Sequence, residues 1–188
     1  MLQTNQRDPA IPTPVKLAHV VLRTTRYDAL RHWYTTVLNA SVQFEDPFLT
    51  FLTYDAEHHR IAIANMPGAE PRSAASDGVD HFAFTYATLA DLLHTYARLK
   101  ADGIVPYWCI NHGPTTSLYY RDPDGNQIEL QVDNFPNQAA LHAWFRSGAF
   151  AANPIGVNFD PDVLLARLER GDPLAELVQQ GSAPPAQA

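Results

Sequence analysis

The sequence lacks the features that mark membrane, disulfide-rich secreted and nucleic-acid-binding proteins. Its single cysteine, Cys109, cannot form an internal disulfide, as is typical of proteins in a reducing compartment. No run of residues approaches the roughly 18 apolar positions of a transmembrane helix, and the polar, proline-rich start has no apolar signal-peptide core. Lys and Arg number 13 against 20 Asp and Glu, so the net charge of −7 disfavours contact with phosphate backbones. We therefore expect a cytoplasmic protein without membrane or nucleic-acid partners.

A repeated pattern is the main feature that the sequence does contain. Residues 17–22 (LAHVVL) and residues 79–84 (VDHFAF) align so that His19 and His81 coincide. A helical pattern follows each of these runs, and three short strand patterns complete each copy. The order βαβββ, repeated with a period of about 60 residues, predicts two modules of the same fold.

The repeat divides the chain into six segments. At 188 residues the chain is long enough to bury a substantial core. In chain order we expect a flexible N-terminal arm (1–14), a first βαβββ module (15–65), a linker (66–78), a second βαβββ module (79–133), a C-terminal helical extension (134–180) and a disordered tail (181–188). This order predicts an α+β fold in which two paired βαβββ modules form a curled mixed sheet.

Hydrophobic periodicity and turn residues place the individual elements. In the first module we expect a helix capped by Thr25 at 26–38 and strands at 15–24, 41–45, 49–54 and 60–65. In the second we expect a terminal hairpin, a helix at 88–101 and strands at 79–86 and 107–111. The extension should form helices near 137–146, 161–170 and 173–179. Their apolar stripes suit a cap over a pocket or a contact with a second subunit, so we expect a homodimer.

The terminal hairpin, residues 112–132, groups residues that can do chemistry. Its turn, Asp122–Asn126, is rich in Pro, Gly, Asp and Asn, which favour a tight reversal between two strands. Because side chains alternate along a strand, Glu129 projects from one face of the second arm and Tyr119 from one face of the first. His112 lies just upstream. A carboxylate, a phenol and an imidazole in one hairpin indicate a functional site.

Two histidines and one glutamate form the candidate metal site. His19 and His81 open the two modules at equivalent positions, and Glu129 lies in the last strand of the second module. Because repeated modules bring equivalent strands together, these three side chains can converge on one point. Two neutral imidazoles and one carboxylate, with the remaining positions open, are the ligands of non-haem Fe(II) oxygenases. The open positions would let a substrate and O2 bind together.

The remaining histidines and several aromatic residues are open to more than one interpretation. The other five histidines suit packing or exposure on predicted helices or in a charged loop; they are His32, His58, His59, His94 and His142. Five aromatic residues suit either the wall of a pocket for a ring or the core; they are Phe48, Phe51, Tyr54, Tyr107 and Trp108.

Together these residues resemble the vicinal oxygen chelate superfamily, which is built from paired βαβββ modules. The most specific segments are LAH (17–19), FLTYDAEHHRIA (51–62), VDHF (79–82) and SLYYRDPDGNQIE (117–129). Within the superfamily, the chain resembles the small single-domain type I extradiol dioxygenases of the biphenyl-2,3-diol 1,2-dioxygenase kind. The resemblance covers residues 15–132 and implies that the two modules together cup a metal.

The resemblance also implies roles for individual residues. His19, His81 and Glu129 would bind Fe(II), with Mn(II) as an occasional alternative. His112 would act as the acid–base residue, and Tyr119 would contact the substrate oxygen. The expected reaction is the opening of a mono- or polycyclic aromatic diol by O2.

The chain departs from the family pattern in three respects. Larger extradiol enzymes carry an extra pair of modules that is absent here. Their acid–base histidine lies further upstream of the tyrosine than His112 does, and the minimal fold has no helical extension.

Two alternative functions are open. One alternative is a glyoxalase I-like lyase or isomerase, although such enzymes take a fourth ligand from a strand that here reads RIAIAN (60–65), without Glu, His or Gln. The other is a non-enzymatic protein that binds an aromatic ligand and needs no metal-ligating side chains.

Overall fold

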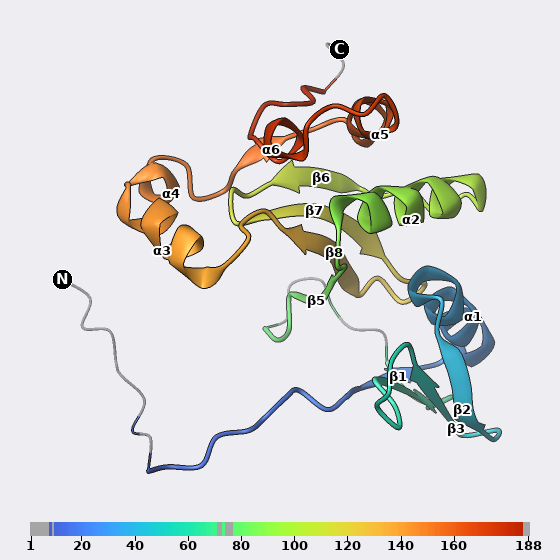
Figure 1. The fold of residues 1–188 in the computed structure, drawn as a ribbon. Helices are drawn as coiled ribbons and strands as arrows, with labels where there is room; N and C mark the ends of the chain where they lie inside the picture. Colours follow the sequence, from blue (N-terminus) through green and yellow to red (C-terminus); the bar gives the residue numbers. More distant parts are fainter. Residues whose placement is uncertain (1–7, 9, 71–72, 74–76, 186–188) are drawn as a thin grey trace.

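Two β-sheets, each with a helix on one face, form the body of the molecule (Figure 1). The computed structural model describes residues 8, 10–70, 73 and 77–185. The first sheet has the strand order β1-β4-β3-β2, and α1 packs against β3 and β4. Its elements are β1 (Val20–Thr24), α1 (Tyr27–Leu38), β2 (Ser41–Glu45), β3 (Leu49–Thr53) and β4 (Ile61–Asn65).

The second sheet repeats this arrangement and gains a strand from the C-terminal extension. Its order is β5-β8-β7-β6-β9, and α2 packs against β8. In each module the first strand pairs in parallel with the last, β1 with β4 and β5 with β8. The elements are β5 (His81–Thr85), α2 (Leu89–Ala101), β6 (Trp108–Asn111), β7 (Thr115–Arg121), β8 (Gln127–Asp133) and β9 (Val157–Asn158). The α+β class and the repeated order are confirmed, and the two modules keep separate sheets within one chain.

Strand pairing determines where the first strand begins. The sequence predicts a strand from residue 15, whereas β1 begins at Val20. Its partner β4 begins at Ile61, which lies opposite Val20, so among the described strands none pairs with the residues before Val20. Val15 and Leu17 are accordingly 95% and 75% exposed. An apolar run therefore marks the strand but not its first residue.

The helix starts also follow local hydrogen bonds. At α2 the side chain of Thr88 accepts a hydrogen bond from the backbone N–H of Asp91 at 3.1 Å, which satisfies one of the free donors of the first turn. The prediction that Thr25 caps α1 is wrong, because no side chain in the described part of the chain caps that helix. Instead the hydroxyl of Thr24 accepts a hydrogen bond from the N–H of Arg26 at 2.8 Å.

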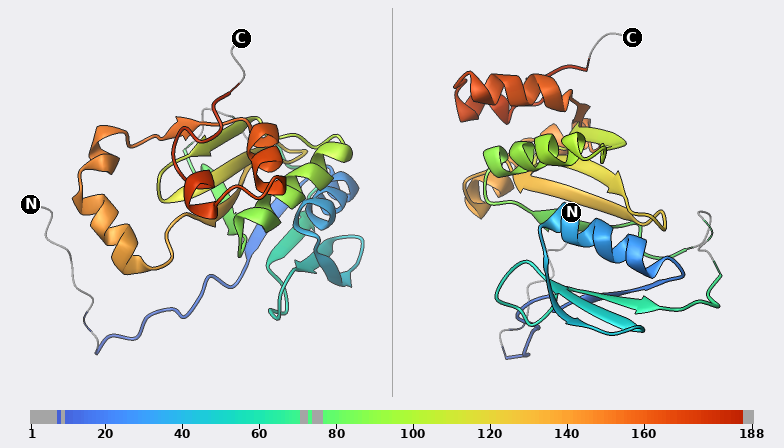
Figure 2. Two further views of the ribbon diagram at one scale, coloured as in Figure 1. Left: turned by 45° about the horizontal axis from the view of Figure 1, so that its top comes forward. Right: turned by 90° about the vertical axis from the view of Figure 1, so that its right-hand side faces the viewer.

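The two modules meet through their helices and through the turn between β7 and β8. Arg98 of α2 donates to the carbonyl oxygens of Thr36 at 2.8 Å and Val37 at 3.2 Å, which belong to the last turn of α1. Carbonyl groups in the last turn of a helix lack the N–H partner four residues on that the helix interior provides, and among the described residues the carbonyl of Thr36 otherwise accepts only from the N–H of Asn39 at 3.4 Å. Tyr34 of α1 donates to the buried carboxylate of Asp122 in the turn at 3.0 Å. In the right-hand view of Figure 2, α1 accordingly lies between the first sheet and the second module.

The C-terminal extension packs on the second module. In α5 the carboxylate of Asp162 accepts a hydrogen bond from Tyr96 of α2 at 2.8 Å, and Leu164 and Leu177 are buried. The sequence predicts neither α4 nor β9, a two-residue strand that pairs with β6. The helices of the extension are α3 (Gln138–Arg146), α4 (Ala149–Ala152), α5 (Pro161–Glu169) and α6 (Leu174–Leu177).

The end of the described chain is packed rather than free. The sequence predicts a disordered tail from residue 181, but Ala183 is fully buried and its carbonyl accepts a hydrogen bond from the N–H of Asp160 at 2.9 Å. Residues 186–188 lie outside the described residues, as do 1–7 and 9 of the predicted arm and 71–72 and 74–76 of the predicted linker. Among the described helices, none combines the length and the apolar character that crossing a membrane requires.

The hydrogen bond between Tyr34 and Asp122 gives the first prediction. Tyr34→Phe removes a donor from a buried carboxylate and should lower the free energy of unfolding by about 1–3 kcal/mol at neutral pH. Burial raises the pKa of Asp122, whereas the bond from Tyr34 lowers it, so losing the bond raises that pKa further. When the pKa of a carboxyl group is raised in the folded state, the free energy of unfolding of the protein falls as the pH rises through that pKa. The difference in free energy of unfolding between the wild type and Tyr34→Phe should therefore be largest above the pKa of Asp122. It should shrink as the pH falls below that pKa.

Urea unfolding over a series of acidic to neutral pH values measures this deficit. Tyr27→Phe is the matched control, because Tyr27 donates to the backbone carbonyl of Asp46 at 2.8 Å, which does not titrate. The control should show the same deficit at every pH. If the deficit of Tyr34→Phe were also independent of pH, the role given to the Asp122 carboxylate would be wrong.

Candidate functional site

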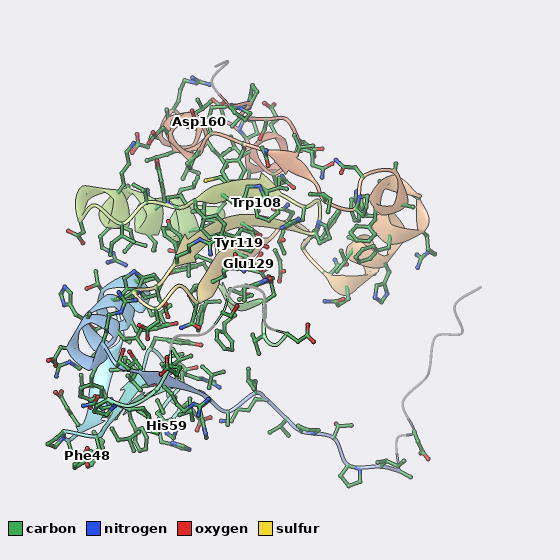
Figure 3. The ribbon with its side chains drawn as sticks, turned by 180° about the vertical axis from the view of Figure 1, so that it is seen from behind. Phe48, His59, Trp108, Tyr119, Glu129 and Asp160 are labelled. Atoms are coloured by element: carbon green, nitrogen blue, oxygen red, sulfur yellow. The ribbon has the colours of Figure 1, made fainter. Side chains whose placement is uncertain are left out.

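The open face of the second sheet, opposite α2, carries a row of functional side chains. Strand pairing places Ala83, Glu129, Tyr119 and Trp108 opposite one another across β5, β8, β7 and β6. Directly paired residues project from the same face, and His81 shares that face because it precedes Ala83 by two positions. Figure 3 shows Trp108, Tyr119 and Glu129 together in this sheet. The structure thus brings together two of the three predicted metal ligands.

His81 lies between two carboxylates. Its Nε2 is 3.0 Å from Oε2 of Glu129, and its Nδ1 is 2.7 Å from Oδ2 of Asp80. Glu129 is buried, whereas the side chain of His81 is 32% exposed. The side-chain amide of Gln127 donates to Asp80 at 3.2 Å. A carboxylate that accepts from the second ring nitrogen is the usual means of orienting a metal-binding histidine.

Tyr119 links this pair to His112. The rings of Tyr119 and His81 are edge to face with centroids 5.3 Å apart, and the hydroxyl of Tyr119 is 3.1 Å from Nε2 of His112. Burial raises the pKa of Tyr119, and the negative charge of Glu129 and a hydrogen bond to it raise that pKa further. The phenol therefore stays protonated at neutral pH and can donate to an oxygen that gains negative charge.

A backbone group of the extension orients His112. The Nδ1 atom of His112 is 2.5 Å from the carbonyl oxygen of Ile155. Because a carbonyl oxygen only accepts hydrogen bonds, Nδ1 carries the proton in this contact. In the neutral ring the lone pair then lies on Nε2, which faces the hydroxyl of Tyr119. The imidazole is thus held with its basic nitrogen toward the open face of the sheet.

A side chain fixes the shape of the loop that supplies this carbonyl, and β9, which follows the loop, pairs with β6. The amide of Asn153 donates to the carbonyl of Gly156 at 2.8 Å and accepts from its N–H at 3.0 Å. Gly156 has a φ of +115°, and a Cβ atom there would lie 2.3 Å from the carbonyl oxygen of Asn111. Glycine is required for both reasons. The position of Ile155 therefore depends on the residue that follows it.

Two aromatic residues flank Tyr119 on the open face. The ring centroid of Trp108 is 4.9 Å and that of Tyr107 is 6.2 Å from the centroid of Tyr119. Flat apolar surfaces of this kind suit an aromatic ligand. The other three aromatic residues that the sequence proposes for a pocket belong to the first module, where they are Phe48, Phe51 and Tyr54.

His19 does not lie with His81 and Glu129 within one chain. It precedes β1 and contacts His59, with ring centroids 4.3 Å apart. His59 is buried and stacks on Phe51 at 4.2 Å. Figure 3 shows His59, from the loop between β3 and β4, in the first module and well away from Glu129 in the second sheet. The predicted convergence of all three ligands is therefore not seen in a single chain.

The donor atoms at His81 and Glu129 suit a divalent metal, but one chain offers only part of a ligand set. An imidazole nitrogen and a carboxylate oxygen on adjacent strands are common ligands of first-row metals. Over residues 8, 10–70, 73 and 77–185, no three His, Cys, Asp or Glu side chains are grouped so that they could hold a metal ion. A third ligand has to come from elsewhere if a metal binds here.

The first module carries no counterpart of Glu129. In the second module Glu129 pairs with Ala83, two residues after His81. In the first module the equivalent pairing joins Ala62 to the residue two positions after His19. Ala62 has no donor atom in its side chain, so the repeat supplies two histidines but only one carboxylate.

Sequence reasoning missed three residues that contact the predicted site residues. Asp80 is adjacent to the predicted ligand His81, and that adjacency is a signal that could have identified it. Ile155 acts through its backbone oxygen, which no residue type reveals. His59 is predicted to be a packing or surface residue of a charged loop, and only the folded structure shows its contact with His19.

Comparisons with known proteins agree with this architecture. The family profile described as the Glyoxalase/Bleomycin resistance protein/Dioxygenase superfamily matches residues 16–130. Biphenyl-2,3-diol 1,2-dioxygenase 2 of Rhodococcus globerulus is 49% identical over 85% of this chain and 84% of its own length. Biphenyl-2,3-diol 1,2-dioxygenase 3 of the same organism is 43% identical over 86% of each chain.

A solved structure supports the fold independently. Lactoylglutathione lyase from Agrobacterium tumefaciens aligns with a TM-score of 0.53 over 64% of this chain and 96% of its own, at 19% identity, which is evidence for the fold alone. Together with the profile match and the two dioxygenases, it agrees with the paired βαβββ order of the fold. The chain belongs to the glyoxalase/bleomycin resistance protein/dioxygenase superfamily.

Proposed function

We propose that the chain is an extradiol ring-cleavage dioxygenase that opens a catechol-type aromatic diol with O2. The observation that carries this proposal is the row of His81, Glu129, Tyr119 and His112 on one open face. In the proposed site, two metal ligands would act beside a phenol donor and an oriented imidazole. The identities of 49% and 43% to two biphenyl-2,3-diol 1,2-dioxygenases support it.

The proposed metal is Fe(II), with Mn(II) as the alternative. His81 and Glu129 would hold it together with His19, and Asp80 would keep the ring of His81 in place through Nδ1. When bound, such a metal supplies open coordination positions for the diol and O2. A single chain would supply two of the three proposed ligands at this point, so the proposed set would be incomplete without a further histidine.

His112 is the proposed acid–base residue. Its Nδ1–H is engaged by Ile155, so Nε2 accepts the proton of one substrate hydroxyl and later returns it to the product. Tyr119 remains a protonated phenol and donates to the substrate oxygen on which charge develops. Both groups act from the open face of the second sheet.

The aromatic ring of the substrate would lie against Trp108 and Tyr107. Their rings flank the phenol of Tyr119, so a planar ligand that reaches Tyr119 with its hydroxyl also contacts flat apolar surface. This arrangement suits mono- or polycyclic catechols. In this arrangement the first module, which carries Phe51 and His59, would not contact the substrate bound on the open face of the second sheet.

The alternative functions fit the site less well. In the related lyases and isomerases, a fourth ligand comes from the strand equivalent to β4, where this chain has Ala62. A protein that binds aromatic ligands without a metal does not require a histidine positioned between two carboxylates, as His81 is here between Asp80 and Glu129. Both alternatives are included in the experiment that tests the proposal.

Oxygen uptake by anaerobically reconstituted, Fe(II)-loaded protein tests the reaction. We expect uptake with a panel of mono- and polycyclic catechols and no isomerisation of the methylglyoxal–glutathione hemithioacetal. Hemithioacetal isomerisation without uptake on any catechol would assign the chain to the lyases. Tight binding of a catechol by metal-free protein, with neither reaction after loading, would make it a binder.

The separation of proton transfer from metal binding gives a further prediction. Replacing His112 by Gln should lower turnover by about 10²–10⁴-fold while the iron content stays at the wild-type level. Replacing His81 by Ala should abolish both iron binding and turnover, since it removes a ligand. Iron analysis and oxygen uptake on the same preparations measure the two effects. Loss of iron from His112→Gln would contradict the separate roles.

The loop that orients His112 gives another prediction. Gly156→Ala places a Cβ atom against the backbone of β6 and should push the carbonyl of Ile155 away from Nδ1. We expect kcat to fall by about 10–100-fold, the range for losing a group that orients a functional imidazole, with KM and iron content unchanged.

Two controls separate orientation from general damage. Gly148→Ala is the matched control, because Gly148 also has a positive φ of +85° but no atom within 4 Å of an added Cβ. It should retain wild-type kcat. In a His112→Gln background, Gly156→Ala should cause no further loss, since its effect acts through His112. Additive losses would show that the loop acts on the site by another route.

A further inference from the structure

A chain of hydrogen bonds crosses the open face of the second sheet beside the candidate site. It starts at Tyr107, whose hydroxyl is 2.6 Å from Oε1 of Gln127. The side-chain nitrogen of Gln127 donates to Asp80 at 3.2 Å, both to the backbone carbonyl and to Oδ1. Oδ2 of Asp80 lies 2.7 Å from Nδ1 of His81. The chain therefore joins an aromatic residue proposed to contact the substrate to a proposed metal ligand.

The chemistry of these groups gives the chain of bonds a direction. Oε1 of Gln127 only accepts hydrogen bonds, so the hydroxyl of Tyr107 donates to it and the nitrogen end of the amide is turned toward Asp80. The guanidinium of Arg121 lies 4.4 Å from the ring centroid of Tyr107, a cation–π contact that helps to hold this ring. Because Gln127 holds Oδ1 of Asp80, the carboxylate presents Oδ2 to the imidazole of His81.

The first module contains the backbone half of this arrangement. In the register of the parallel strand pairs, Arg60 corresponds to Gln127, and Ala18 corresponds to Asp80. A side-chain nitrogen of Arg60 donates to the backbone carbonyl of Ala18 at 3.2 Å, as Gln127 does to that of Asp80. The bond to the backbone is thus common to both modules. The bond to a carboxylate distinguishes the second, since alanine has no acceptor in its side chain.

The change from arginine to glutamine has a chemical consequence next to Glu129, for which the first module has no counterpart. A guanidinium in the place of Gln127 would compete with a divalent cation for the carboxylates of Asp80 and Glu129. A neutral amide orients Asp80 and leaves its negative charge in place. A carboxylate that keeps its charge raises the basicity of the histidine that it contacts.

We propose that Gln127 is a positioning residue of the metal site, which orients Asp80 and through it His81, and that Tyr107 orients Gln127. The inference rests on the proposed function, because it takes His81 as a metal ligand from it. Gln127 acts through Asp80 and not by contact with the metal or the diol. Its effect is to keep Nε2 of His81 directed toward the carboxylate of Glu129, 3.0 Å away.

The affinity of the full-length protein for Fe(II), measured without oxygen by competition with a chromogenic chelator, tests the inference. Asp80→Ala removes the contact with His81 and should weaken Fe(II) binding by about 10–100-fold. Gln127→Met keeps the length of the side chain but removes the donor, and should weaken binding by about 2–10-fold, the contribution of one hydrogen bond. Added to Asp80→Ala, Gln127→Met should cause no further loss, because it acts through Asp80.

Gln131→Met is the matched control. Gln131 lies on the same strand and face as Gln127 and donates to the hydroxyl of Thr85 in β5 at 3.0 Å, so the control removes an amide bond between the same two strands. Its Fe(II) affinity should equal that of the wild type. Tyr107→Phe tests the chain of bonds from its other end and takes the place of Gln127→Met if that variant does not fold. It should weaken Fe(II) binding less than Gln127→Met does, since the amide keeps its donor and loses only its fixed orientation.

A second measurement depends on neither iron nor activity. In the Zn(II)-loaded protein, NMR follows the exchange of the Nδ1 proton of His81 with water. Gln127→Met should speed this exchange, because Asp80 is then free to turn away from the proton. Gln131→Met should leave the exchange rate unchanged.

Two results would overturn this inference and leave the proposed function intact. One is wild-type Fe(II) affinity and wild-type proton exchange in Gln127→Met. The other is a full further loss of affinity when Gln127→Met is added to Asp80→Ala. A wild-type protein that binds neither Fe(II) nor Zn(II) would overturn the proposed function, and this inference with it.

Discussion

The buried carboxylate of Asp122 is the group on which the arrangement of the site depends. It accepts hydrogen bonds from the backbone N–H and the side-chain amide of Asn126, both at 2.8 Å, and thereby closes the turn between β7 and β8. Side chains alternate along a strand, so a slip of one residue would turn Glu129 and Tyr119 toward the core. Asp122 also accepts the hydrogen bond of Tyr34, so one carboxylate both sets this register and anchors the first module.

For the second module, the sequence predicted which side chains of the candidate site lie close together. Alternation along β8 identified the face of Glu129, and turn chemistry identified the hairpin that brings Tyr119 opposite it. The repeat identified His81 and His19 as equivalent residues. These signals are local, because each depends on neighbours within a few residues or on a comparison of two short segments.

Other features were not accessible from the sequence, for two physical reasons. The distance between His19 and His81 depends on how the modules pack, which is decided by contacts such as that of Arg98 with the end of α1. The orientation of His112 depends on a backbone oxygen at Ile155, and every residue has such an oxygen. The two-residue strand β9 is too short to give a periodic pattern, so neither it nor the loop before it could be predicted.

The treatment of the remaining sheet edges has a consequence for solubility. The β6 edge is covered by β9, and a bulge between Val42 and Phe44 interrupts the pairing of β2, the outer strand of the first sheet. Bulges and short covering strands are two of the ways in which proteins prevent open-ended aggregation. In the described part of the chain, the regular edges that remain are β1 and β5. Resistance to open-ended aggregation therefore depends on how these two strands are kept from pairing with further chains.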